Sequence, residues 1–96
     1  MRYITYPTTL VLQAIADGAR YGFDIADRTG LQTGTVYPAL RRLEAKGWIK
    51  GKWGVSENNR RARFYELTSA GRKQLDAERA AWERFSNALG LILSAD

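Results

Sequence analysis

Hydrogen-bonding and basic side chains gather between residues 32 and 42, where apolar residues recur at helical spacing. Amide and hydroxyl groups at the start of a helix can bind base edges or phosphate oxygens, and a guanidinium can bind guanine or the DNA backbone. This stretch therefore predicts a helix that contacts DNA. The alternative is that the threonines only cap the helix and that the tyrosine only fills the core. The candidate residues are Gln32, Thr33, Thr35, Tyr37, Arg41 and Arg42.

A second basic cluster, Arg60, Arg61 and Arg63, follows at the turn between two strand-like runs. Arginines on a hairpin suit phosphates or a narrow minor groove. The alternative is a loop that only improves solubility. Lys50 and Lys52 are weaker candidates, because lysines on an exposed strand also protect a sheet edge from unwanted pairing.

The positive charge of the chain is confined to the stretch that holds these candidates. The 96 residues carry a net charge of +5. Residues 41–63 hold eight basic and two acidic side chains, a net of +6, so the remaining residues sum to −1. This distribution predicts a polyanionic partner, namely double-stranded DNA. A solvated basic surface without a partner is the alternative.

The composition argues against an enzyme. The chain has no histidine and no cysteine, which removes the commonest general base, the thiolate nucleophile and the commonest metal ligands. Asp24 and Asp27 lie three residues apart without a partner for catalysis, and we expect both to face solvent. We expect no catalytic site, no metal and no cofactor. The apolar run at residues 10–12 is too short for a membrane span, which predicts a cytoplasmic protein.

Three helices are expected to position the DNA-contacting residues. The first begins at Pro7–Thr9 and ends at Asp17-Gly18, and the second runs from Tyr21 to Gly30. The third spans residues 33–46 and is capped by Thr33 or Thr35, with Gly47 as its stop. Pro38 belongs near its N-terminal end, where a missing amide costs little.

A hairpin and a long helix complete the chain. Alternation predicts a half-buried strand with Ile49, Trp53 and Val55 on one face, and the return strand spans residues 62–67. Thr68 then caps a helix with a heptad pattern interrupted at Glu78. We interpret its apolar seam as a homodimer interface, although flat rings brought together there are also suited to a planar aromatic effector. The seam residues are Leu75, Trp82, Phe85, Leu89 and Ile92.

Taken together, these elements predict an α+β, mainly helical fold: a winged helix-turn-helix with a C-terminal dimerisation helix. Residues 1–67 would form the winged-helix unit and residues 68–96 the dimerisation helix, as one compact domain. A rival interpretation is a winged helix that binds an acidic protein partner and has no specific DNA site.

Several motifs also resemble those of PadR-type transcriptional regulators, over roughly residues 8–75. They are Tyr21-Gly22-Phe23-Asp24-Ile25, Gly34-Thr35-Val36-Tyr37-Pro38-Ala39-Leu40, Arg42-Leu43-Glu44, Gly47-Trp48-Ile49, Arg63-Phe64-Tyr65 and Leu67-Thr68-Ser69-Ala70-Gly71. The resemblance implies a homodimeric regulator, usually a repressor, that binds a nearly palindromic operator. It implies that Tyr21 joins Thr33, Thr35, Tyr37 and Arg41 at the helix-turn-helix contact. It further implies that some such proteins release DNA when a planar compound binds at the dimer interface.

Overall fold

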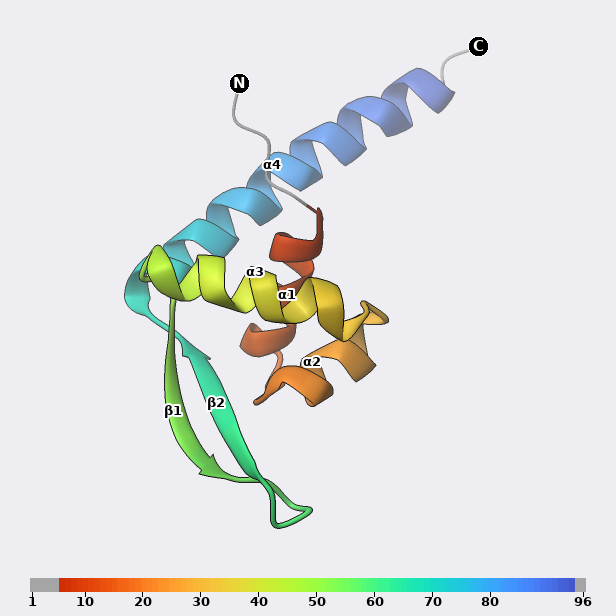
Figure 1. Ribbon diagram of the computed structural model, residues 1–96. Coiled ribbons are helices and arrows are strands. Elements are labelled where there is room, and N and C mark those ends of the chain that lie inside the picture. The colour runs from red at the N-terminus through yellow and green to blue at the C-terminus, as the bar shows by residue number, and fades with distance from the viewer. Residues whose placement is uncertain (1–5, 95–96) are drawn as a thin grey trace.

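The computed structural model describes residues 6–94, which form four helices and a two-stranded antiparallel sheet (Figure 1). The order of elements is helix, helix, helix, strand, strand, helix, so the expected winged-helix arrangement is confirmed. The helices are α1 (Tyr6–Ala16), α2 (Gly22–Thr29), α3 (Thr33–Ala45) and α4 (Ser69–Ser94), and the strands are β1 (Ile49–Val55) and β2 (Arg61–Leu67).

The core lies where α1, α2 and α3 pack on one another and on the beginnings of β1 and α4. Each helix contributes one apolar stripe, as expected for amphipathic helices that cover a small core. Ile49 at the start of β1 closes the core from the hairpin side, and Leu75 closes it from α4. The largest fully buried side chains are Leu12, Ile25, Leu40, Leu43, Ile49 and Leu75.

The start of α3 differs from the expectation of a threonine cap. Gln32 occupies the N-cap position in an extended conformation, and its side chain forms no capping hydrogen bond. The backbone carbonyl of Gln32 accepts the amides of Thr35 and Val36 at 2.9 and 3.0 Å, so Thr33 already belongs to the helix. Pro38 lies inside α3 and has no amide to donate to the carbonyl of Gly34. The helix also ends at Ala45, one residue earlier than predicted.

The hairpin is buried only at its base. Ile49 pairs with Leu67 beside the core, and Val55 pairs with Arg61 at the distal end. The side chains of Trp53 and Val55 are 55% and 65% exposed, so the prediction that they lie on a half-buried face was wrong. Alternation gives the face of a residue, but not how far the hairpin extends past the helices. Figure 1 shows the strands running from the helical body to a loop at their far end.

A single bridge fastens the middle of the hairpin to the body. Tyr21, between α1 and α2, pairs with Phe64 of β2 in an antiparallel bridge. The amide of Tyr65 donates to the carbonyl of Arg20 at 2.8 Å. The rings of Tyr21 and Phe64 meet edge to face with centroids 5.4 Å apart. This contact fixes the direction in which the hairpin leaves the domain.

Thr68 joins the end of α3 to the start of α4. Its hydroxyl accepts the amide of Gly71 at 3.0 Å, as an N-cap does, and donates to the carbonyl of Gly47 at 2.6 Å. Its own amide donates to the carbonyl of Trp48 at 3.0 Å. The predicted cap at Thr68 is therefore confirmed, and the same side chain ties α4 to the segment that follows α3.

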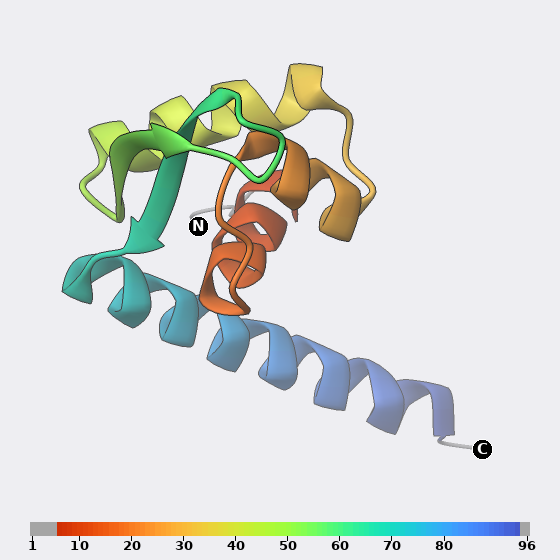
Figure 2. The ribbon, with the colours of Figure 1, turned by 90° about the horizontal axis from the view of Figure 1, so that it is seen from below.

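Only the first turns of α4 pack on the body, and the rest projects away from it, on the opposite side from the hairpin (Figures 1 and 2). Within residues 6–94, no helix is both long enough and apolar enough to cross a membrane.

Candidate nucleic-acid interface

One face of α3 is buried in the core, and the other is open to solvent and accessible to a partner. Val36, Ala39, Leu40 and Leu43 are buried on the core side. On the opposite side Thr35 is half-buried and the other candidates are exposed. The predicted DNA-contacting residues that lie on this surface are Gln32, Thr33, Thr35, Tyr37, Arg41 and Arg42. The structure thus places all six residues on α3 or directly before it, outside the stripe that faces the core.

Tyr37 combines packing with exposure. Its ring covers the backbone of Gly22 at the start of α2 and meets the ring of Phe23 edge to face, with centroids 6.4 Å apart. The side chain nevertheless remains 37% exposed, so it does not simply fill the core. Contact with α2 therefore orients the ring of Tyr37, while part of the side chain stays accessible on the surface of α3.

The three arginines of the hairpin occupy two different environments. Arg60 and Arg61 are exposed, and neither forms an ion pair with any residue that the structure describes. Arg63 instead lies on β2 against α3, where its guanidinium donates to the carboxylate of Glu44. The hydrogen bond with Glu44 raises the pKa of Arg63 above its usual value. Arg63 thus holds the hairpin beside α3, and Arg60 and Arg61 remain available for a partner.

Tyr65 lies in the same contact between β2 and α3. Its ring packs against the core, and burial raises the pKa of its phenol above the usual value, with the nearby Glu44 carboxylate acting in the same direction. Tyr65 therefore helps to hold the hairpin against the core.

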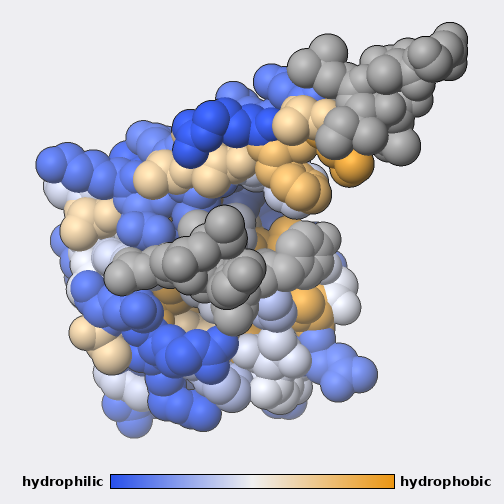
Figure 3. Space-filling model, turned by 90° about the horizontal axis from the view of Figure 1, so that it is seen from above, coloured by the Kyte–Doolittle hydropathy of each residue, from blue (hydrophilic) through white to orange (hydrophobic). Residues whose placement is uncertain are grey.

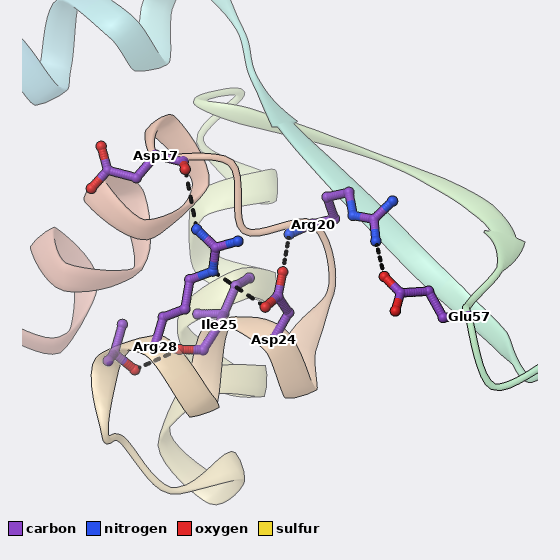
Figure 4. A network of polar contacts seen from close by, with 7 residues as sticks. Asp17, Arg20, Asp24, Ile25, Arg28 and Glu57 are labelled. Atoms are coloured by element: carbon purple, nitrogen blue, oxygen red, sulfur yellow. Dashed lines mark hydrogen bonds and ion pairs between the residues drawn. The ribbon is translucent and has the colours of Figure 1, made fainter.

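Tyr21 lies at the N-cap of α2 and packs against the hairpin. Its ring contacts Phe64, and the guanidinium of Arg20 lies over both rings at 6.0 and 5.8 Å. Arg20 also reaches the hairpin loop, where it pairs with Glu57 at 2.7 Å (Figure 4). In this structure Tyr21 positions the hairpin.

The prediction that both acidic residues of α2 face solvent was wrong for Asp24. It is half-buried, accepts the amide of Arg20 at 3.1 Å and pairs with Arg28 at 3.3 Å (Figure 4). Arg28 in turn donates to the carbonyl of Asp17 at 3.1 Å. Asp27 is exposed, as expected. These contacts are structural and fix the connection between α1 and α2.

The acidic partners of Arg63 and Arg20 were not predicted from the sequence. No pattern in the sequence linked Glu44 to Arg63 or Glu57 to Arg20, because the two pairs are 19 and 37 residues apart. Trp53 was assigned to a half-buried face, yet the structure places it in the open beside Arg61 and Arg63. Trp53 pairs with Arg63 across the hairpin. With this register known, the contact between the indole and the guanidinium could have been predicted, because directly paired residues lie on one face of the sheet.

The predicted seam of α4 is divided by the structure into a buried and an exposed part. Leu75 is fully buried within the domain, so it cannot serve as an interface residue. Trp82 and Phe85 are 62% and 57% exposed, with ring centroids 5.7 Å apart, and Leu89 is exposed as well. The side chain of Ile92 lies outside the described residues. Figure 3 shows hydrophobic residues gathered along the projecting part of α4.

The polar break in that seam, Glu78, is buried between α4 and α1. Its Oε1 accepts the hydroxyl of Thr9 at 3.1 Å, and its Oε2 has no hydrogen-bond partner among the described residues. Burial raises the pKa of this carboxyl above its usual value, and the hydrogen bond from Thr9 opposes the shift. Within the described part of the chain, no three acidic residues lie close enough to hold a metal ion.

The comparison with protein families covers most of the chain. The Transcriptional regulator PadR-like family matches residues 11–77. The transcriptional regulator Rv3488 of Mycobacterium tuberculosis (strain ATCC 25618 / H37Rv) is 35% identical over 68 residues, which are 71% of this chain and 57% of that protein. An uncharacterised protein X of Lysinibacillus sphaericus is 24% identical over 93 residues, or 88% of this chain and 85% of its own length.

Solved structures agree with the family match. A PadR family transcription regulator from hypervirulent Clostridium difficile R20291 superposes with a TM-score of 0.83 at 27% identity, covering 94% of this chain and all of that one. The protein smu.1704 from Streptococcus mutans UA159 superposes with a TM-score of 0.85 at 25% identity, covering 99% and 95%. The family consists of transcription regulators and not of enzymes. By sequence and by fold, the chain belongs to the PadR-like family of transcriptional regulators.

Proposed function

We propose that this regulator binds a specific duplex in the cytoplasm, with α3 in the major groove and the hairpin on the flanking backbone. The observation that carries the proposal is the ion pair between Arg63 and Glu44. It holds the hairpin beside α3, while Arg41, Arg42, Arg60 and Arg61 form no ion pair with described residues. A surface with this excess of unpaired positive charge suits phosphates on both sides of a groove.

The exposed seam of α4 supports a homodimer. Trp82, Phe85 and Leu89 form an apolar stripe on a helix that projects from the domain, and a second copy of the same helix would cover it. Such a dimer would address two half-sites about one helical turn, roughly 34 Å, apart. We propose that it represses transcription by occluding a promoter. The same rings would form the wall against which a planar aromatic effector could stack.

Replacing Thr35 tests the readout of bases by α3. Thr35→Ala should lower the preference for the protein's own upstream DNA over a scrambled duplex by about five- to a hundredfold, because a lost base contact costs about 1–3 kcal/mol. Fluorescence anisotropy with both duplexes, measured across a salt series, gives the ratio directly. An unchanged ratio would remove Thr35 from the readout.

The wild-type protein in the same titration decides between the two function classes. Preference for its own upstream DNA that survives physiological salt supports a sequence-specific regulator. Equal binding to both duplexes that salt abolishes would instead favour a winged helix whose basic surface binds an acidic protein.

Replacing Phe85 tests the dimer. Phe85→Asp places a charge in the exposed stripe, so the protein should become monomeric in analytical ultracentrifugation and should bind a two-half-site duplex at least about tenfold more weakly. Arg84→Ala, at the neighbouring exposed position, is the control, and in the same experiment it should keep the molecular mass of the dimer. A dimer that persists in the Phe85 variant would place the interface elsewhere.

A further inference from the structure

Trp53 is an exposed aromatic side chain with two arginines beside it. The guanidinium carbon of Arg61 lies 4.4 Å from the centroid of the indole, and that of Arg63 lies 5.6 Å from it. In the register of the hairpin, Trp53 pairs with Arg63 and Val55 pairs with Arg61, so all four side chains lie on one face of the sheet. Both distances are within the range of a cation–π interaction.

The two arginines differ in what else they contact. Arg63 is neutralised by Glu44 of α3, whereas Arg61 has no acidic partner among the described residues. Two neighbouring guanidinium groups repel each other, and the Glu44 carboxylate offsets that repulsion at Arg63. The result is a continuous row, Glu44, Arg63, Trp53 and Arg61, that runs from α3 along the hairpin.

The backbone of β1 leaves room for this row. A Cβ atom at Gly51 would lie 2.5 Å from Nε of Arg63, so the absence of a side chain at this position lets the guanidinium lie close to the strand. Trp53 itself has no role in the core, since more than half of its surface is exposed. Because the neighbouring strand carries Arg61, which has no acidic partner among the described residues, this exposed tryptophan calls for a role at the surface.

We propose that Trp53 is a positioning residue for DNA binding: its indole holds the guanidinium of Arg61 in place for a phosphate of the duplex backbone. A free arginine loses considerable side-chain entropy when it binds a phosphate, and stacking on a rigid ring removes part of that loss beforehand. The row through Arg63 and Glu44 then sets the distance from this contact to α3. The inference rests on the proposed function, because it assigns a part of the same interface.

A double-mutant cycle tests the proposal. Trp53→Leu should weaken binding to the upstream duplex and to its scrambled form alike, by about five- to tenfold, because a phosphate contact carries no sequence information. In the background of Arg61→Ala, the same replacement should change the affinity less than twofold, since the group that it positions is gone. Trp53→Phe keeps an aromatic face and should therefore retain most of the wild-type affinity.

The controls separate positioning from simple structural damage. Val55→Ala removes an exposed apolar side chain directly opposite Arg61 and should leave the affinity within twofold. Thermal unfolding of each variant shows whether the fold is retained, and an exposed position predicts little change. Arg61→Ala alone should also reduce the slope of the logarithm of the affinity against the logarithm of the salt concentration by about one unit, the value of one phosphate contact.

Two results would overturn the proposal. Unaltered affinity of Trp53→Leu would show that the ring is not needed, and an equal loss with and without Arg61 would show that it acts independently of that residue. Either result leaves the proposed function standing as long as the wild type still prefers its own upstream duplex to the scrambled one at physiological salt. A wild type that binds neither duplex would overturn the proposed function itself.

Discussion

Gly71→Ala is expected to destabilise the protein by about 3 kcal/mol or more, a large part of the stability of a domain of this size. A Cβ atom at this position would lie 1.8 Å from the carbonyl oxygen of Trp48. That neighbour is backbone, and it also accepts the amide of Thr68, so it cannot move aside without breaking the start of α4. Chemical denaturation followed by circular dichroism measures the change in unfolding free energy.

The matched control is Gly90→Ala in the same helix. A Cβ atom at Gly90 meets nothing within 4 Å, so the higher helix propensity of alanine should leave the stability unchanged or raise it by up to about 1 kcal/mol. If the same replacement destabilises the protein at Gly71 and not at Gly90, the loss is due to the close approach of Gly71 to Trp48. Equal stabilities of the two variants would contradict this explanation.

Glu78→Gln is expected to raise the unfolding free energy at neutral pH by about 1–2 kcal/mol, because removing a neutral amide from water costs less free energy than removing a charged carboxylate. The wild-type carboxyl lies between α1 and α4 with one oxygen unpaired among the described residues. Urea titrations of both proteins at pH 7 measure the difference. Glu83→Gln, on an exposed position of the same helix, corrects for the loss of one negative charge.

The pH dependence of this difference follows from the raised pKa of Glu78. The folded state binds the proton more tightly than the unfolded state, so the cost of burying the charge is fully present above the folded pKa. As the pH falls through the folded pKa, the wild type becomes more stable relative to Glu78→Gln, and the gap closes below the usual glutamate pKa. A glutamine variant that is less stable at pH 7 would show that Oε2 has a donor in the native assembly.

The order and type of the elements were predictable because each is encoded locally. Helical spacing of Val36, Leu40 and Leu43, alternation after Trp48 and the cap at Thr68 are signals within a few residues. These signals gave the winged-helix order and the long last helix correctly. The exposed surface of α3 followed from the same periodicity, because the residues that do not face the core must face solvent.

The remainder depends on contacts between distant segments. No local pattern pairs Arg63 with Glu44 or Arg20 with Glu57, so the arginines that look alike in sequence could not be sorted into paired and unpaired ones. Leu75 fits the heptad pattern as well as Trp82 does, but only the packing of α1 shows that it is buried within the domain. The position of Gln32 at the N-cap of α3, without a capping hydrogen bond from its side chain, likewise cannot be predicted from side-chain preferences.

The joint at Thr68 has a mechanical consequence for the whole molecule. The 26 residues of α4 form a rod about 39 Å long that is fixed to the domain only near its base. A rotation of about 10° at that base would displace the far end by about 7 Å, the length of roughly two base-pair steps. The angle of this rod relative to α3 is set by the hydroxyl of Thr68, which bonds both ends of the joint, together with the packing of Leu75 and Glu78 on the body. In an assembly built through α4, the contacts at the base of each copy of this helix would thus govern the span between the two α3 helices.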